Sequence, residues 1–505
     1  MRDTLPSMDK PNVLLVTTDH WPGSLLGVAG HPAIRTPTLD QLARNGVLFP
    51  NAASECPVCI PARRSLMTGL MPRTHGSLHN DTRPMPDAPT LAGCFHDAGY
   101  QTYAVGKLHV TPQRQRLGFD DVILDEEGRG KEGVGQDDYE LFLGDNGYPG
   151  QRFAGGMNNN EYVWRAWHLP ERLHVTSWAA STMARQIKRR DPLRPAFWYL
   201  SFSHPHPPLA PLQAYLDLYR DVDPPLPFVG EWAKPADGLP APIEEETRRL
   251  EHWDDRPDLI KDILRAFYAQ CTHIDHQLRL VIGTLREEGL LNNTIVCFTA
   301  DHGDMLGNHH MWAKHQMYRD SVGVPMILMG TDAQMHDGTV GFGRVDERLV
   351  GLADVMPTLL NLAGVPTPPN VEGIPMVGPN KRAYGYSLWG TGDGEGFGPT
   401  RMVRDCRFKM VYYPSGNAVQ LFDLAADPQE MCDVSADPAF AADRSRLEEK
   451  LVEFLKESDE DRRWIKGGAL SGTASREYAP RPNRGLSGQR GSHWPPPEPG
   501  VVPWG

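Results

Sequence analysis

Four short apolar runs organise the chain, and ionisable residues follow each of them. The runs cover residues 12–18, 103–106, 197–202 and 294–299. Continuous apolar runs of this length are typical of parallel strands that are buried on both faces. Asp19 follows the first run, Lys107 and His109 the second, His204 and His206 the third, and Asp301 and His302 the fourth. Because open α/β sheets bind ligands at the carboxyl ends of their strands, we expect these side chains to share one edge.

Helical patterns alternate with these runs. Apolar residues at helical spacing predict helices over residues 38–45, 90–98 and 257–288, and a glycine follows each segment. Alternating strands and helices predict an α/β fold, here a large mixed, mostly parallel sheet sandwiched by helices.

The pattern changes near residue 380. Short strands are predicted at 382–387, 402–413 and 419–424, followed by an amphipathic helix at 439–457. We therefore divide the chain into an α/β domain (1–380), a smaller C-terminal α+β subdomain with an antiparallel sheet (381–465), and an extended Pro/Gly-rich arm (466–505).

Two long segments interrupt the first domain. Residues 110–170 and 207–245 are rich in Gly, Pro, Asn and Asp, and insertions of this length are usually functional lids or rims. They carry Trp164, Trp167 and Trp232. These side chains either line a substrate mouth or pack as ordinary loop residues.

Composition narrows the class of partner. The 505 residues are 40% hydrophobic and 23% charged, which is an ordinary globular profile. The net charge of −13 argues against a nucleic-acid binder. Because the overall charge is negative, an anionic substrate would need a local basic pocket. Seven cysteines imply no disulfide framework. The apolar run at 13–18 is too short for a signal peptide or a membrane span, so we expect a cytoplasmic protein that does not bind membranes.

The arm suggests self-association. It carries Trp494 and Trp504 among prolines and glycines, and exposed tryptophans of this kind favour packing on another subunit. We expect a homo-oligomer.

The stretch around Cys59 predicts the chemistry. Pro61 suits the first turn of a helix over residues 61–68, and Gly69 suits its end. Cys59 then lies at a helix N-terminus, where backbone N–H groups and the helix dipole acidify a thiol and attract anions. Arg63, one turn further on, can point at the same anion. Cys56 and Cys59 also form a C-x-x-C pair, which leaves open a redox pair, half of a zinc site, or buried structural cysteines.

The pattern Cys59-x-Pro61-x-Arg63 resembles the signature of the type I, formylglycine-dependent sulfatases of the alkaline phosphatase superfamily. The resemblance extends from Pro11 to about Arg463. Further segments that resemble the family's motifs are Pro11 to Asp19, Gly106-Lys107-Leu108-His109, His204-Pro205-His206, Asp301-His302-Gly303-Asp304 and Trp312-Ala313-Lys314. One departure is His20, where the family often has a second aspartate.

The resemblance implies a cofactor and its ligands. Cys59 would be oxidised to formylglycine by a maturation enzyme, and the aldehyde hydrate would attack a small-molecule sulfate ester. One divalent metal would be held by Asp19, Asp301, His302 and an oxygen of residue 59, with His20 as a further ligand or a supporting residue. Carboxylates suit Ca²⁺, the expected ion, and imidazoles shift the preference toward Mn²⁺ or Zn²⁺.

The remaining residues would handle the ester. By resemblance, Lys314 and His206 grip the sulfate, and His206 protonates the departing alcohol. Arg63, Lys107 and His109 hold and polarise the aldehyde hydrate, with His109 as the base that helps to expel sulfate.

Two other functions stay open from the sequence. A phosphonate monoester or phosphodiester hydrolase of the same superfamily would also use formylglycine, and His20 suits that alternative. A non-catalytic oxyanion-binding protein would keep Cys59 unmodified.

Overall fold

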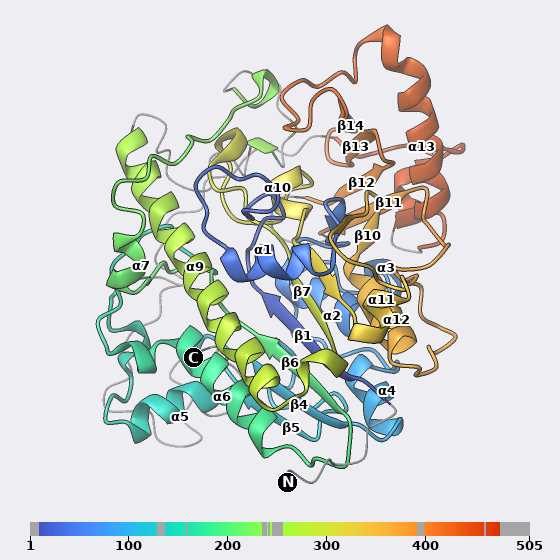
Figure 1. The fold of residues 1–505 in the computed structure, drawn as a ribbon. Helices are drawn as coiled ribbons and strands as arrows, with labels where there is room; N and C mark the ends of the chain where they lie inside the picture. The colour runs from blue at the N-terminus through green and yellow to red at the C-terminus, as the bar shows by residue number, and fades with distance from the viewer. Residues whose placement is uncertain are drawn as a thin grey trace.

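The computed structural model describes residues 10–128, 137–157, 160–234, 240, 243–244, 256–390, 398–458 and 461–474. Among these residues, an eight-stranded sheet with the order β5-β4-β6-β1-β7-β8-β2-β9 lies at the centre (Figure 1). Its strands are β1 (Asn12–Thr18), β2 (Val47–Leu48), β4 (Gln101–Gly106), β5 (Asp121–Leu124), β6 (Ala196–Ser201), β7 (Thr294–Ala300), β8 (Met326–Met329) and β9 (Arg344–Val345).

Most of this sheet is parallel. The strands β5, β4, β6, β1 and β7 run in one direction, whereas β8 is antiparallel to both β7 and β2. The four predicted runs are the neighbouring strands β4, β6, β1 and β7, and β1, β6 and β7 are buried along their whole length. The predicted fold class is confirmed, and burial on both faces explains why these strands read as continuous apolar runs.

Helices cover both faces of the sheet. The helices α1 (Pro37–Arg44), α6 (Val175–Arg189) and α9 (Pro257–Glu287) pack together on the face where α9 crosses the sheet in Figure 1. A second layer consists of α2 (Cys59–Thr68), α4 (Leu91–Asp97) and α12 (Val355–Leu362). The predicted helices at 38–45, 90–98 and 257–288 coincide with α1, α4 and α9.

The insertions are more structured than their composition suggested. Residues 110–170 contain β5 at the sheet edge and α5 (Asp138–Asp145), and residues 207–245 contain α7 (Gln213–Asp217). Among the residues that the structure describes, no helix combines the length and apolarity that crossing a bilayer requires.

The C-terminal part forms its own antiparallel sheet. Its strands β11 (Gly385–Trp389), β12 (Thr400–Arg404), β13 (Phe408–Tyr413) and β14 (Ala418–Asp423) lie in sequence order, and α13 (Ala441–Leu455) packs on β12 and β13. The single strand predicted over 402–413 is wrong. Asp405 Oδ1 accepts hydrogen bonds from the N–H groups of Arg407 (2.7 Å) and Phe408 (2.6 Å), and this turn separates two strands.

The start of the predicted arm also differs from expectation. Here β15 (Ile465–Lys466) and β16 (Ala469–Leu470) form a hairpin. Gly467 and Gly468 occupy its turn with φ values of 58° and 86°, which favour glycine. Residues 475–505, including Trp494 and Trp504, lie outside the described residues, so oligomerisation through the arm stays a prediction.

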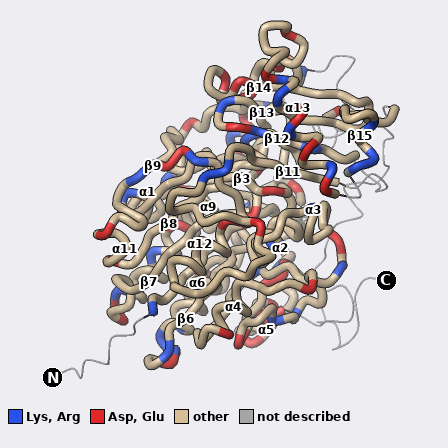
Figure 2. The backbone as a smooth tube through the Cα atoms, turned by 90° about the vertical axis from the view of Figure 1, so that its right-hand side faces the viewer, with Lys and Arg blue, Asp and Glu red and all other residues tan. Residues whose placement is uncertain are grey.

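The C-terminal sheet docks beside the N-terminus of α2 (Figure 2). Its inner residues share an apolar cluster with Cys56, Val58 and the 305–318 segment. Ser387 Oγ donates to the Ser54 carbonyl (2.6 Å), and the Leu388 N–H donates to the Glu55 carbonyl (2.8 Å). The C-terminal sheet therefore holds the residues that directly precede Cys59.

Candidate active site

The predicted side chains meet at one edge of the large sheet. Asp19 follows β1, Lys107 follows β4, His206 lies beyond β6, and Asp301 and His302 follow β7. All five are buried, with at most 3% of any residue exposed. The parallel order of their strands brings them together, as the sequence predicted.

The helix α2 presents Cys59 to this edge. The helix begins at Cys59, two residues earlier than predicted, because Val58 is extended and serves as the N-cap. Gly69 ends the helix with φ 66° in the left-handed region, which favours glycine. Cys59 is completely buried, and its thiol lies at the positive end of the helix dipole.

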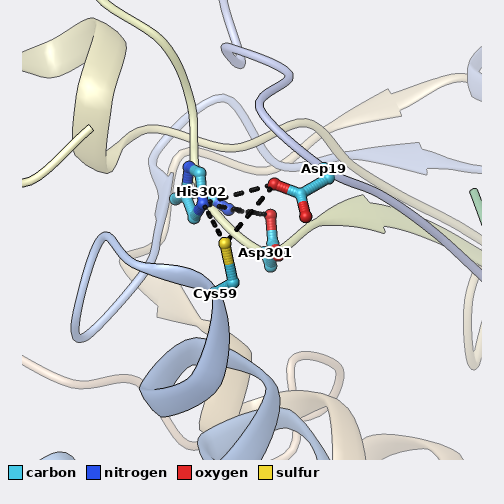
Figure 3. A group of neighbouring side chains, drawn as sticks. All are labelled: Asp19, Cys59, Asp301 and His302. Atoms are coloured by element: carbon cyan, nitrogen blue, oxygen red, sulfur yellow. Dashed lines mark hydrogen bonds and ion pairs between the residues drawn. The ribbon is translucent and has the colours of Figure 1, made fainter. Parts of the chain in front are cut away.

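The Cys59 sulfur faces the metal-type donors Asp19, Asp301 and His302 (Figure 3), and it also contacts a lysine ammonium group. Sγ lies 2.9 Å from Lys314 Nζ, 3.4 Å from His302 Nε2 and 3.7 Å from Asp19 Oδ1. The site therefore combines an anion-binding position with a cation-binding one.

The surrounding charges acidify the thiol. Burial raises the pKa of Cys59, and so does Asp19. Lys107, Lys314 and His302 outweigh both effects and lower this pKa to about 7, below its ordinary value of 9.0. The direction agrees with the acidified cysteine predicted from the sequence, but its causes are side-chain cations, where the sequence argument invoked the helix N-terminus.

The donor set fits a divalent ion. One ligand atom each from Asp19, Cys59, Asp301 and His302 lies within 4.8 Å of the others, and all four residues are buried. Burial lowers the pKa of His302, but Asp301 raises it, and the net shift is upward. Such a concentration of buried acceptors is stabilised by a cation. Asp19, His20 and His206 form a second such group that shares Asp19 with the first.

Arg63 contacts both carboxylates of the site. Its Nε donates to Asp301 Oδ2 (2.9 Å), and Nη1 donates to the Lys107 carbonyl (2.8 Å) and Ser201 Oγ (2.8 Å). Nη2 lies 3.5 Å from Asp19 Oδ2. Arg63 therefore holds two metal-type ligands in place, and its predicted contact with the aldehyde hydrate stays a prediction.

Lys107 lies between two carboxylates. Its Nζ donates to Asp19 Oδ2 and to Glu127 Oε1 (3.0 Å). Lys107 is completely buried, so water does not screen the interaction of its charge with residue 59. Sequence reasoning placed Lys107 at the site but missed Glu127, which comes from the 110–170 insertion.

His206 and Lys314 form a second pair. Lys314 Nζ lies 3.5 Å from His206 Nε2, and His206 Nδ1 donates to the Pro207 carbonyl (2.6 Å). Burial lowers the pKa of His206 to about 3, although Glu127 opposes this shift, so the imidazole is neutral near pH 7. The His204 ring contacts His174, with ring centroids 5.1 Å apart, and its Nδ1 lies 3.5 Å from Thr176 Oγ1.

His109 lies beside this group, two residues after Lys107. Its φ is 58°, and its backbone N–H donates to Glu126 Oε1 (2.8 Å). The structure thus fixes the backbone of His109, and its role as a base stays a prediction.

Three contributors could not be identified as such from the sequence. Glu127 and Tyr162 come from the 110–170 insertion, where no periodicity points to a site. Asp304 lies two residues after His302, and this spacing within a recognised motif was the one available signal.

Two of the three tryptophans, Trp164 and Trp232, differ in their surroundings. Trp164 is 41% exposed and pairs with Leu209, three residues after His206, which suits a rim. Trp232 stacks on Tyr318 and donates to the Glu430 carbonyl (2.7 Å), so it packs structurally.

Comparison with protein families points to one group. Residues 11–365 match the family model described as sulfatase, and residues 307–457 match the C-terminal model of N-sulphoglucosamine sulphohydrolase. An arylsulfatase of Clostridium perfringens is 32% identical over 473 residues, which cover 89% of this chain and 95% of that protein. A choline-sulfatase of Rhizobium meliloti is 26% identical, covering 87% of this chain and 85% of that protein.

Solved structures share the fold. A phosphonate monoester hydrolase of Agrobacterium radiobacter superposes with a TM-score of 0.74 at 24% identity, covering 89% of this chain and 96% of that one. At this identity the likeness concerns the architecture alone.

Proposed function

Because the chain belongs to the sulfatase family, we propose that it is a sulfuric ester hydrolase whose nucleophile is residue 59, matured from cysteine to formylglycine. The net reaction converts a sulfate ester and water into an alcohol and hydrogen sulfate. One observation carries the proposal: the Cys59 sulfur lies 2.9 Å from Lys314 Nζ and 3.4 Å from His302 Nε2. Residue 59 thus touches both an anion-binding cation and the metal-type donors.

Asp19, Asp301 and His302 would hold the ion together with residue 59. When present, the hydrated aldehyde supplies two hydroxyl groups, one to displace the alcohol from sulfur and one through which sulfate is released, and the ion supplies positive charge beside them. Arg63 keeps the carboxylates in position through its contacts with Asp301 and Asp19.

Lys314 and His206 would receive the transferred group. The Lys314 ammonium neutralises a sulfuryl oxygen, and its contact with neutral His206 places a mobile proton next to the oxygen of the departing alcohol. Lys107 keeps a positive charge beside residue 59 for the release of sulfate, and His109 is the proposed acceptor of the last proton.

Maturation and turnover are tested together. The full chain is produced with and without a formylglycine-generating enzyme, and the mass of the tryptic peptide of residues 45–63 is compared with sulfate release from nitrophenyl sulfate. We expect activity in proportion to the aldehyde-containing peptide. Full activity in a protein that retains the thiol contradicts the proposal. A thiol that persists in the presence of the maturation enzyme, together with sulfate binding but no turnover, supports the non-catalytic alternative.

A phosphonate ester hydrolase is the second candidate, because His20 stands where sulfatases often have aspartate. A matched pair of nitrophenyl esters separates the two, since only the transferred group differs. We expect a higher kcat/KM for the sulfate. A tenfold preference for the phosphonate reverses the assignment.

We also propose Ca²⁺ or Mn²⁺ as the ion, a cytoplasmic location, and a homo-oligomer joined through the arm. All seven cysteines are described and unpaired, which supports a reducing compartment.

Elemental analysis of the purified protein identifies the metal. Truncation after Arg463 is expected to lower the mass measured by light scattering, and an unchanged mass contradicts the role of the arm.

A further inference from the structure

Three consecutive acidic residues of the 110–170 insertion, directly after β5, are buried. Asp125 is 1% exposed, Glu126 2% and Glu127 4%, and we call these residues the acidic triplet. Acidic side chains are almost never fully buried unless they are paired. Glu127 also has φ 55°, in the left-handed region that is uncommon for a residue with a Cβ. Such a conformation is maintained only where the surroundings fix it.

Each member of the acidic triplet holds one part of the segment 106–109, which follows β4 and carries Lys107 and His109. The contacts are the hydrogen bonds from the Asp125 N–H to the Gly106 carbonyl (3.1 Å), from the N–H groups of Leu108 and His109 to Glu126 Oε1 (2.8 Å each), and from Lys107 Nζ to Glu127 Oε1 (3.0 Å). Lys107 and His109 are the two residues that the proposed function assigns to the release of sulfate. The triplet therefore contacts the part of the site that serves this step.

Glu127 differs from the other carboxylate that contacts Lys107. Asp19 belongs to both groups of possible metal ligands among the described residues, whereas Glu127 belongs to neither. Asp19 thus has to serve the ion site as well as Lys107. A charge-assisted hydrogen bond is roughly twice as strong as a neutral one, so Glu127 holds the Lys107 ammonium independently of the ion site.

Arg152 anchors the acidic triplet from within the insertion. Its Nη2 donates to Asp125 Oδ1, and its Nη1 donates to Asp137 Oδ2 (3.2 Å). Asp137 Oδ2 also accepts from the Glu126 N–H (2.7 Å), and the Glu127 N–H donates to Asp125 Oδ1 (3.3 Å). This network fixes the backbone of the triplet, so the Glu127 carboxylate is presented to Lys107 in a defined position.

Glu127 has a weaker interaction with His206. Oε1 lies 3.8 Å from His206 Nδ1, which donates instead to the Pro207 carbonyl (2.6 Å). Glu127 therefore acts on His206 only through its charge, whereas it contacts Lys107 directly. Nitrophenolate is a good leaving group, so its departure depends little on a proton from His206. A nitrophenyl ester thus separates the two interactions.

We infer that Glu127 is a positioning residue for the second half of the reaction, in which sulfate is released. It holds the Lys107 ammonium beside residue 59, while Glu126 fixes the backbone of His109. The inference rests on the proposed function, because it assigns Glu127 to one half of that reaction. Loss of the Glu127 carboxylate should therefore slow the release of sulfate and leave the departure of the alcohol unchanged.

Two rates separate the halves of the reaction. With matured enzyme in excess over nitrophenyl sulfate, stopped-flow absorbance follows the departure of nitrophenolate alone. With substrate in excess, kcat includes the release of sulfate. Expressed per folded, matured protein, kcat of Glu127→Ala should fall about 10- to 100-fold, as for a misplaced catalytic group, and the single-turnover rate should stay within about twofold. Glu127→Gln should lose less, because its amide oxygen still accepts from Lys107.

Glu430→Ala is the matched control, because Glu430 is similarly buried and pairs with Lys409 of β13. Both of its rates should match those of the parent protein. Because Glu127 acts through Lys107, the double variant Lys107→Ala/Glu127→Ala should have the kcat of Lys107→Ala to within about twofold. Equal losses of both rates in Glu127→Ala, or losses that multiply in the double variant, overturn the inference.

Melting temperature tests the pair without turnover. In the unmatured protein, Glu127→Gln should lower the melting temperature of the parent but raise that of Lys107→Ala, where it removes a buried carboxylate that has lost its lysine. A lower melting temperature in both backgrounds overturns the pairing. A matured parent protein that releases no nitrophenolate contradicts the proposed function. An active parent whose Glu127 variants behave like Glu430→Ala contradicts this inference alone.

Discussion

Two sets of buried or partly buried histidines lie close together in the described part of this molecule, and only one belongs to the proposed active site. The first set is His20, His206 and His302, and the second is His174, His204 and His273. Burial lowers the pKa of most members of both sets, so a depressed pKa does not distinguish them.

The difference lies in what the rings face. His174 Nε2 donates to the Ala210 carbonyl (3.1 Å), and His273 Nε2 lies 3.0 Å from Ser177 Oγ. These are neutral partners. His273 Nδ1 also lacks a hydrogen-bond partner, but its electrostatic neighbours are other histidines and not a carboxylate.

The first set instead contacts carboxylates, a thiol and an ammonium group directly. In the second set His204 has Arg152 and Glu127 as electrostatic neighbours, but its hydrogen-bond partner is the Thr176 hydroxyl. Direct contact with charge of both signs is therefore the better marker of chemistry.

The nucleophile gives the largest contrast. Cys59→Ala should lower turnover to background, by about 10⁶-fold as for the loss of other covalent nucleophiles. Cys56→Ala is the matched control, because Cys56 is equally buried but lies in the apolar cluster beneath the C-terminal sheet. Sulfate release per folded protein, with folding checked by circular dichroism, measures both. If Cys59→Ala and Cys56→Ala lose turnover to a similar extent, the assignment of Cys59 as the nucleophile is contradicted.

Substitution of two buried lysines tests whether the charge at the site contributes to kcat separately from the structural effect of removing a buried side chain. Lys107→Ala removes the cation between Asp19 and Glu127 and should lower kcat about 100- to 1,000-fold. Lys409 is equally buried and pairs with Glu430 in the C-terminal sheet, so Lys409→Ala should reduce thermal stability but preserve kcat of the folded fraction. A kcat that survives in Lys107→Ala shows that its charge is dispensable.

The unmatured protein offers a pH test. The pKa of Cys59 lies at about 7, whereas burial raises the pKa of Cys56 well above its ordinary value. The thiolate of Cys59 should therefore appear as pH rises through 7, while Cys56 stays protonated. Ultraviolet thiolate absorbance, taken as the difference between the parent protein and Cys59→Ser, gives the midpoint. A midpoint near 9 shows that the cations do not acidify the site.

The smallest effect is expected in the second histidine set. His273→Gln loses the contact with Ser177 and should lower the free energy of unfolding by about 1–3 kcal/mol. Its kcat should stay within about twofold of the parent value, since His273 touches no reacting group. Urea unfolding and steady-state rates measure the two effects. A hundredfold loss of kcat in His273→Gln contradicts the claim that only the first histidine set takes part in the reaction.

The sequence predicted the parts of the site that lie at strand ends. Asp19, Lys107 and Asp301 directly follow apolar runs. Because these runs pair as parallel strands, the three residues lie at the same edge of the sheet. Glu127 and Tyr162 escaped prediction because they come from an insertion without periodicity, and their contacts depend on tertiary packing. The contact of Asp304 Oδ2 with His20 Nδ1 joins residues 284 positions apart, a separation that no local pattern encodes.

The docking of the C-terminal sheet sets a time limit on maturation. Ser387 donates a hydrogen bond to the Ser54 carbonyl, and the two residues are 333 positions apart in the chain. Residue 59 has no exposed surface in the complete fold. At synthesis rates of about 5–20 residues per second, roughly 15–70 s pass between the emergence of these two segments. The proposed maturation enzyme thus has its access during this interval, and a slower ribosome lengthens it.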